Sequence, residues 1–529
     1  MNYLDWSILI GYLLGLIAFG MYLSRSQFSI EDYYVASKNM RWYNIGLSTM
    51  ATQLSAISFI SAPAFVALKE NGGLIWLGYE FAVPFSIIVV GTIILPLFHR
   101  LKIISIYEYL EFRFDVATRK FLSIVFQISR GLAGGVAIYA AAIVLSVMLG
   151  LKIWQTILII GTVTLIYDFL GGMKIVVYSD VIQMIILFAG ILICTLSAFN
   201  TLPDWGAITN MVPFERLKTI DFINTGLGDG NDFTFWSLLF GGFFLYISYY
   251  GCDQSQMQRE ISAKNLAEGQ KSLLLNGFAR FPIVLAYCLM GIFIGAYFYL
   301  NPDMMKLVPF DKPDMMVPVF IIHHLPNGVI GFLFVAILAA AMSSLDSTLN
   351  SLSATTMNDL ILPRLKQKKA YSDTKVLLFS RLTTIFWGFF AIGFAFLTGA
   401  ISESVIVAIN KIGSLFYGSI AAAFLVGLLT KKARGISVRI GILAGVLFNF
   451  ILWKFVPGVS WLWWNVLGFA ITFGLAWILG NNKETSVEFH FSKVKDWIES
   501  PIFWKKSVFL LIGFGIMITL VTYCLPQLF

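Results

Sequence analysis

Long apolar stretches follow one another along nearly the whole chain. Each holds about 20 residues, enough for a helix to cross the hydrocarbon core of a bilayer. Few stretches alternate apolar and polar residues at period two, so the pattern favours an all-α membrane protein over a β-barrel. We predict fourteen spans, at about 4–24, 44–68, 74–98, 121–149, 153–170, 176–199, 234–257, 272–300, 328–361, 376–399, 402–430, 436–456, 460–480 and 505–526.

Composition supports this interpretation. The 529 residues are 58% hydrophobic and 12% charged, whereas a soluble globular chain is roughly 25% charged. The first span begins with Asp5 and has no small-residue cleavage site after it, so we expect a retained helix rather than a signal peptide. The connecting loops are mostly short, which predicts a single membrane domain over residues 1–529.

The charges of the loops predict the orientation. The loops at 363–375 and 431–439 carry five and four basic residues, whereas the long loop at 203–233 carries five acidic and two basic ones. Basic short loops stay in the cytoplasm. Over fourteen spans this places both termini outside the plasma (inner) membrane. The net charge of +8 then reflects topology and requires no nucleic-acid partner.

Signals of chemistry are weak. The four cysteines show no CxxC spacing, and no glycine-rich phosphate loop stands at a strand–helix junction. We find no pairing of a nucleophile with a base, so we do not expect an enzyme. We also expect no obligate protein partner.

Polar residues crowd one apolar span, in the stretch "AAAMSSLDSTLNSLSATTMND" at 339–359. A charged Asp at the centre of a bilayer costs roughly 2.5–3.5 kcal/mol, so Asp346 is expected to face a cavity or a partner. Hydroxyl and carboxylate oxygens suit a small hard cation. Serines alone are also common where membrane helices pack closely. Asp346 makes an ion site the better interpretation.

Two other spans are interrupted. Pro63 and several polar residues break the pattern in 50–65, and Gly251 and Asp253 break it in 246–259. Each broken span opens a run of five helices, which is typical of secondary transporters with inverted repeats. We therefore divide the chain into a leading helix (4–24), a first repeat plus the first helix of the second (44–257), a second repeat (234–430) and trailing helices (436–526).

Five motifs carry a resemblance to a known family: "EDYYVASKNMRWYNIG", "QLSAISFIS", "GGMKIVVYSDVIQ", "DQSQMQREISAKNLAEGQK" and "AAAMSSLDSTLNS". In them the chain resembles the sodium/solute symporter family, whose members carry sugars, sialic acid, proline or monocarboxylates. The resemblance implies a LeuT-type five-plus-five inverted repeat, with one extra N-terminal and three extra C-terminal helices. It also implies Na⁺ as the coupling ion and the only metal.

The resemblance assigns one sodium site to Ala51, Leu54, Ala340, Ser343 and Ser344. It suggests a possible second sodium at Asp180, Ser343, Asp346 and Ser347, although Asp346 stands where the best-understood members with two sodium sites have Ser. Asp180 has an alternative role, as the cap of a helix end.

The resemblance also assigns a set of substrate-binding residues: Gln53, Ser55, Ser58, Tyr79, Glu80, Arg130, Tyr249, Arg280 and Asn410. Either tyrosine alone is also compatible with simple packing. Arg130 lies about 16 Å deep by helical rise. It suits a bidentate clamp on a carboxylate, or a structural pairing with Glu80 or another acid.

The expected function is sodium-coupled import of a small polar solute, a sugar or a sugar acid such as sialic acid. The alternatives are a monocarboxylate, inositol or amino-acid carrier. A sodium-permeable channel is less compatible, because the polar residues cluster midway along the spans. A membrane sensor normally adds a signalling domain, and the loop at 481–505 is too short for one.

Overall fold

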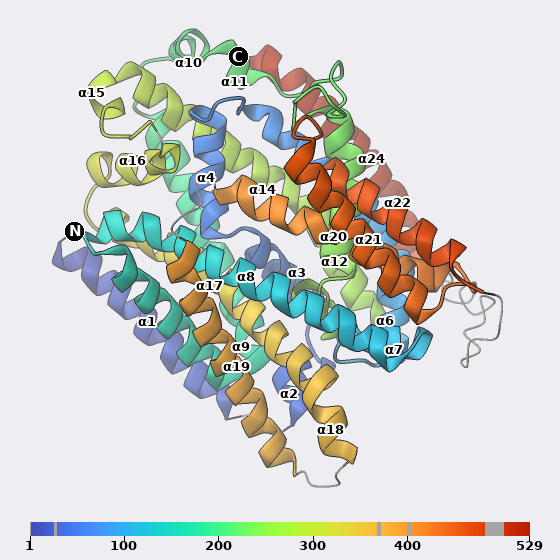
Figure 1. Ribbon diagram of the computed structural model, residues 1–529. Helices are drawn as coiled ribbons and strands as arrows, with labels where there is room; N and C mark the ends of the chain where they lie inside the picture. Colours follow the sequence, from blue (N-terminus) through green and yellow to red (C-terminus); the bar gives the residue numbers. More distant parts are fainter. Residues whose placement is uncertain (1, 26–28, 311, 368–371, 399–404, 482–501) are drawn as a thin grey trace.

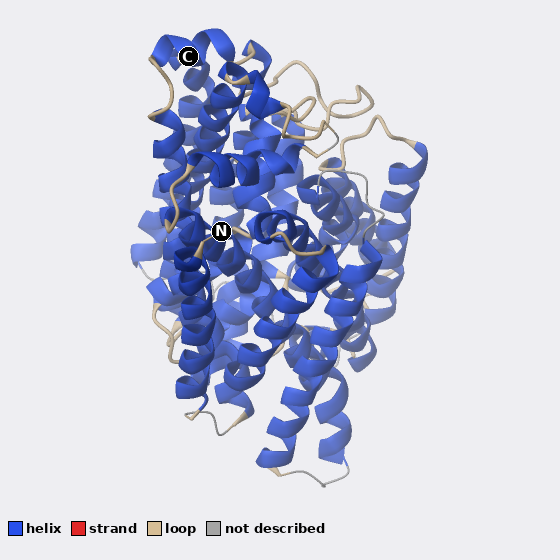
Figure 2. Ribbon diagram, turned by 90° about the vertical axis from the view of Figure 1, so that its left-hand side faces the viewer, coloured by secondary structure: helices blue, strands red, loops and turns tan. Residues whose placement is uncertain are grey.

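The chain folds into a bundle of helices (Figure 1). The computed structural model describes the chain except for residues 1, 26–28, 311, 368–371, 399–404 and 482–501. Within the described part, the strand-like pairings are two isolated bridges, Met40 with Ala263 and Leu227 with Val459. Figure 2 accordingly shows helices joined by loops. The loop predicted at 481–505 lies almost wholly outside the described residues.

Helices lie in each of the fourteen ranges where the apolar pattern predicts a span. They are α1 (Tyr3–Ser24), α3 (Trp42–Gln53) with α4 (Ala56–Ala67), the run from η2 (Leu74–Glu80) through α5 (Val83–Val89) and η3 (Val90–Ile94) to α6 (Leu95–Leu101), α8 (Val116–Leu149), α9 (Ile153–Phe199), η4 (Ser237–Gly241) with α12 (Gly242–Gly251) and α13 (Gln254–Ile261), α14 (Leu266–Leu300), α17 (Val329–Thr355), α19 (Asp373–Leu397), α20 (Val405–Leu429), α21 (Gly435–Phe455), α22 (Trp463–Ile478) and α24 (Ile502–Cys524).

Short helices lie between these elements or, for η8, after the last of them. They are α2 (Ile30–Val35), η1 (Ala36–Lys38), α7 (Glu108–Arg113), α10 (Trp205–Met211), α11 (Phe214–Leu217), α15 (Pro302–Met305), η5 (Pro313–Met315), α16 (Met316–His324), η6 (Thr356–Ile361), α18 (Leu362–Gln367) and η8 (Leu525–Leu528). Figure 1 shows α10, α11, α15 and α16 at one end of the bundle and α2 and α18 at the other.

Ten helices of the described chain are long and apolar enough to cross a membrane, or eleven if α3 and α4 count as one bent span. The predicted spans that this criterion misses are short or divided. Ile153–Phe169 and Trp463–Ile478 are apolar but shorter than 18 residues, and α12 and α13 divide a third. The chain is therefore an all-helical membrane protein, and the count of fourteen spans stays a prediction.

Two of the predicted spans are joined without a loop. The ranges 153–170 and 176–199 form the single helix α9, which is kinked at Gly172 (φ 50°). A side chain at this position is disfavoured for two reasons: φ is positive, and a Cβ atom would lie too close to the backbone oxygen of Tyr33.

Both ends of the chain contact the same end of the bundle. The Asp5 carboxylate on α1 accepts hydrogen bonds from the backbone N–H groups of Gly328 (2.7 Å) and Gly331 (2.9 Å), where α17 begins. The indole of Trp205, the first residue of α10, donates to the carbonyl of Leu528 at 2.9 Å. These contacts tie the first helix to the start of α17 and the last residues to the segment that follows α9.

Candidate ion and solute site

The second predicted span breaks at Leu54 and Ser55, and α3 and α4 meet there at 55°. Leu54 (φ −90°, ψ 74°) and Ser55 (φ −76°, ψ 173°) are not helical. A helix that ends leaves its last carbonyls without intrahelical donors. In a membrane these oxygens need other partners.

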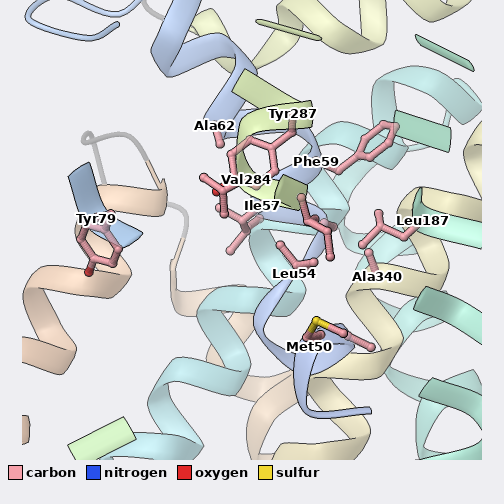
Figure 3. Close-up of a cluster of buried hydrophobic side chains, with 14 of the residues drawn as sticks. Met50, Leu54, Ile57, Phe59, Ala62, Tyr79, Leu187, Val284, Tyr287 and Ala340 are labelled. Atoms are coloured by element: carbon pink, nitrogen blue, oxygen red, sulfur yellow. The ribbon is translucent and has the colours of Figure 1, made fainter. Parts of the chain in front are cut away.

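The hydroxyls of α17 supply those partners. Ser343 Oγ donates to the carbonyl of Ala51 at 3.1 Å, and Ser344 Oγ donates to that of Thr52 at 3.0 Å. The same hydroxyls lie 3.1 and 3.5 Å from the carbonyl of Ala340. Figure 3 shows Leu54 at the turn between Met50 and Ile57. Ala340, on the neighbouring helix α17, lies beside this turn.

The five residues assigned to the first sodium site therefore meet at the break. The printed contacts join the carbonyls of Ala51 and Ala340 to the hydroxyls of Ser343 and Ser344, and Leu54 lies at the break itself. Ala51, Leu54, Ala340 and Ser343 are buried, and Ser344 is partly buried. Such a donor set suits Na⁺ and offers no thiolate or imidazole to a softer metal.

The four residues assigned to a second sodium are also close together, and all are buried. Ser347 Oγ lies 3.1 Å from Asp346 Oδ1 and 2.6 Å from the carbonyl of Ser343. The hydroxyl of Tyr167 donates to Asp346 Oδ2 at 2.6 Å. The alternative role of Asp180 as a helix cap is wrong, because Asp180 lies in the interior of α9.

The structure adds Arg259 to this second set. Its guanidinium lies 2.9 Å from Asp180 Oδ2, contacts the hydroxyl of Ser347, and donates to Ser48 Oγ at 2.7 Å. The side chains of Arg259 and Asp180 are 1% and 0% exposed, so the pair is removed from water. Arg259 stands in a motif that the sequence singled out, but its role requires contacts with three distant helices.

A cavity opens beside the break. It contains about 1130 Å³ of empty space, including the part open to solvent. All nine residues assigned to substrate binding line it, and so do Leu54 and Ser344 of the first sodium site. The sequence did not assign several further lining residues, four of them aromatic: Trp76, Tyr246, Tyr287 and Tyr417.

Aromatic rings form much of the cavity wall. The rings of Trp76 and Tyr79 are stacked, with centroids 5.2 Å apart and an interplanar angle of 4°. The Tyr79 hydroxyl donates to Asn410 Oδ1 at 3.2 Å. Such walls suit ligands with apolar faces and polar edges.

Two arginines reach the cavity, and each has an acidic partner. Arg280 Nε lies 2.6 Å from Glu80 Oε2, and its Nη2 donates to the hydroxyl of Tyr246 at 2.9 Å. Arg280 also contacts the amide oxygen of Gln53, which accepts from Tyr250 at 2.9 Å. Glu80 is thus the partner of Arg280.

Arg130 pairs with a different acid from the one the sequence named first. Its Nε donates to Asp253 Oδ2 at 2.6 Å, and its Nη2 contacts the same oxygen. The guanidinium carbon lies 5.3 Å from the ring centroid of Tyr249 and 5.9 Å from that of Tyr417. The pairing of Arg130 with Glu80 is wrong, and Asp253 is the other acid.

The formal charges at the cavity therefore balance. Among the described residues that line it, Glu80, Arg130 and Arg280 are charged. Asp253, behind Arg130, supplies the second negative charge. A solute meets a polar but neutral surface.

Comparison with known proteins gives consistent results. Residues 33–447 match the sequence model of the sodium:solute symporter family. The sodium/sialic acid symporter NanT of Aliivibrio fischeri is 29% identical over 470 residues, which cover 88% of this chain and 90% of that protein. The sodium-coupled monocarboxylate transporter 1 of Homo sapiens is 28% identical over 458 residues, which cover 85% of this chain and 72% of that protein.

A solved structure is similar as well. A Na⁺-coupled sialic acid symporter in a substrate-bound, outward-open state superposes with a TM-score of 0.79. The two sequences are 25% identical, and the match covers 90% of this chain and 97% of that one.

Proposed function

Because the chain belongs to the sodium:solute symporter family, and is thus a sodium-coupled transporter rather than an enzyme, we propose that its solute is a small hydroxyl-rich molecule. A sugar is the first candidate and a sugar acid the second. The proposal rests on the cavity at the break between α3 and α4, which joins balanced charges, aromatic walls and the oxygens of the sodium site.

We assign the sodium ion to the carbonyls of Ala51, Leu54 and Ala340 and the hydroxyls of Ser343 and Ser344. The hydroxyl hydrogens that now point at carbonyl oxygens would turn away, so that all five oxygens face the ion. Ser343→Ala and Ser344→Ala each remove one ligand while suiting a helix.

The ion and the solute share one structural element. Leu54 and Ser344 belong to the sodium set, and both line the cavity. Sodium bound between α3 and α17 holds the backbone at the break in one conformation. That conformation places Gln53, Ser55 and Ser58 in the cavity wall. Coupling then follows because the state with a fixed break has the higher affinity for both ligands.

The lining favours hydroxyl-rich solutes. Gln53, Ser55, Ser58 and Asn410 supply donors and acceptors, and the stacked rings of Trp76 and Tyr79 supply an apolar face. Balanced charges favour a neutral sugar over an anion. The sugar acid remains the second candidate because Arg130 reaches the cavity and because NanT, a relative, is a sodium/sialic acid symporter.

We further propose the finer architecture that the sequence predicts. It comprises fourteen spans in a five-plus-five inverted repeat, in one domain, with both termini outside the plasma membrane and no obligate protein partner. We keep a second sodium at Asp180, Ser343, Asp346 and Ser347 as a proposal. The charge moved per solute tests it.

The deciding experiment is uptake into proteoliposomes. Purified protein is tested with galactose, N-acetylneuraminate, pyruvate and proline, with and without an inward sodium gradient. We expect sodium-dependent accumulation of the sugar or the sugar acid, and counterflow of labelled solute, which a channel does not support. Accumulation of pyruvate or proline alone would overturn the substrate class and leave the family assignment intact.

A further inference from the structure

We propose that Asp253 determines which solutes the cavity accepts. By occupying Arg130, it makes the protein a carrier of neutral solutes and excludes carboxylates. This inference rests on the proposed function, because it concerns the same cavity. It adds a residue that lies outside the cavity lining and outside the nine assigned positions.

Arg130 already holds a carboxylate on one edge of its guanidinium. The Nε and Nη2 atoms form one edge of the guanidinium, and both contact Asp253 Oδ2. The rings of Tyr249 and Tyr417 hold the guanidinium carbon at 5.3 and 5.9 Å. A planar fork held in this way is suited to bidentate binding of a carboxylate, and here the protein supplies that carboxylate itself.

Asp253 is held in place by a second set of bonds. Its Oδ1 accepts hydrogen bonds from the backbone N–H (2.8 Å) and the hydroxyl (2.6 Å) of Ser255, at the start of α13. The carboxylate therefore caps a helix with one oxygen and neutralises Arg130 with the other. A rotation of the Asp253 side chain away from Arg130 would also break its cap on α13.

Arg130 and Asp253 differ in how far their side chains are exposed. The Arg130 side chain is 16% exposed and lines the cavity, whereas that of Asp253 is 6% exposed and lies behind it. The positive charge of Arg130 is already neutralised by Asp253. A solute carboxylate that approaches Arg130 is therefore repelled by the negative charge of Asp253. Like charges in a site of low dielectric repel strongly, so acids bind poorly. A neutral sugar meets no such cost.

Asp253→Asn tests this directly. Asn has nearly the same shape and remains a good N-cap, so it keeps the bonds from Ser255 but loses the negative charge. Arg130 is then a buried charge without a counterion, and an external carboxylate can supply one. The matched control is Arg130→Gln/Asp253→Asn, which has no charge to neutralise.

Binding is measured in sodium with matched pairs, glucose with glucuronate and galactose with galacturonate. We expect wild type to prefer the neutral member of a pair. Asp253→Asn should shift the ratio of acid to neutral affinity by on the order of 10²-fold toward the acid, as two charge-assisted hydrogen bonds partly offset by water would give. The double variant should lose that shift. An unchanged ratio in Asp253→Asn, or a shift that persists in the double variant, would overturn the inference.

A second measurement is independent of the solute. Acetate is added to each purified protein, and the melting temperature is recorded. Acetate should raise the melting temperature of Asp253→Asn and leave wild type and the double variant unchanged. No rise in Asp253→Asn overturns the inference even where no sugar binds. A rise in Asp253→Asn without any sugar binding keeps the inference and overturns the proposed substrate class instead.

Discussion

Glu80 and Arg280 lie 200 positions apart in the sequence, yet Oε2 of the first is 2.6 Å from Nε of the second. One comes from the end of η2 and the other from the middle of α14. The pair holds these two elements together beside the cavity. Both side chains also bond to Tyr246, which lies 3.5 Å from Glu80 Oε1.

We expect Glu80→Gln and Arg280→Gln each to lower the stability of the protein by about 3 kcal/mol, because each leaves a buried charge unpaired and the cavity admits some water. The double variant should lose less than the sum of the two. Thermal unfolding in detergent measures all three proteins. Strictly additive losses would show that the two charges do not interact.

Ser343→Ala and Ser344→Ala should each raise the sodium concentration for half-maximal uptake by about tenfold, since one oxygen ligand is worth about 1.4 kcal/mol. Ser351→Ala on the same helix is the matched control, because the Ser351 hydroxyl bonds to the carbonyl of Thr348 within α17. Uptake is titrated with Na⁺ at fixed solute. A sodium dependence equal to that of Ser351→Ala in both variants would remove the assignment.

Asp180→Asn should lower the Hill coefficient for Na⁺ toward one, and Asp346→Ser should keep transport. Asp180→Asn should also lower the melting temperature, because Arg259 loses its buried partner. Sodium titration of uptake and the charge moved per solute measure the change in sodium binding. Thermal unfolding measures the change in stability separately. A wild type with a Hill coefficient of one and one Na⁺ per solute would rule out the second ion.

Arg130→Ala should leave the affinity for a neutral sugar within about threefold of wild type while it lowers thermal stability, because Asp253 is left unpaired. Arg130→Lys should recover part of the stability, since a point charge cannot form the planar fork. Binding and melting are measured on the same samples. A loss on the order of 10²-fold confined to carboxylate ligands would establish the sugar acid as the solute.

The positions of the helices could be predicted from the sequence because the bilayer imposes a length and an apolar surface on every span. An interruption of the second span was also predictable, since its polar residues do not suit a lipid-facing helix, but Pro63, which the sequence named, lies inside α4 and the break is at Leu54 and Ser55. The join within α9 was not, because Gly171-Gly172 is equally compatible with a loop and with a kinked helix. Only the packing of Tyr33 against Gly172 decides between them.

The partners of the charged residues could not be predicted. Asp253 was visible as an interruption, and Arg130 as a deep charge, but 123 positions separate them. The spacing of residues in the sequence predicts which side chains share a face of one helix. It does not predict which side chains of different helices are in contact. Arg259 was missed for the same reason, because its partners lie on α3, α9 and α17.

Asp5 attaches the first helix, α1, to α17, the helix that carries the serines of the proposed sodium site. Its carboxylate is bonded to the backbone at the start of α17, so α1 is attached to the element that carries Ser343 and Ser344. Tyr3, two residues earlier, is 97% exposed and available for labelling. A fluorophore at residue 3 would report any movement of the start of α17, and it lies outside the cavity lining.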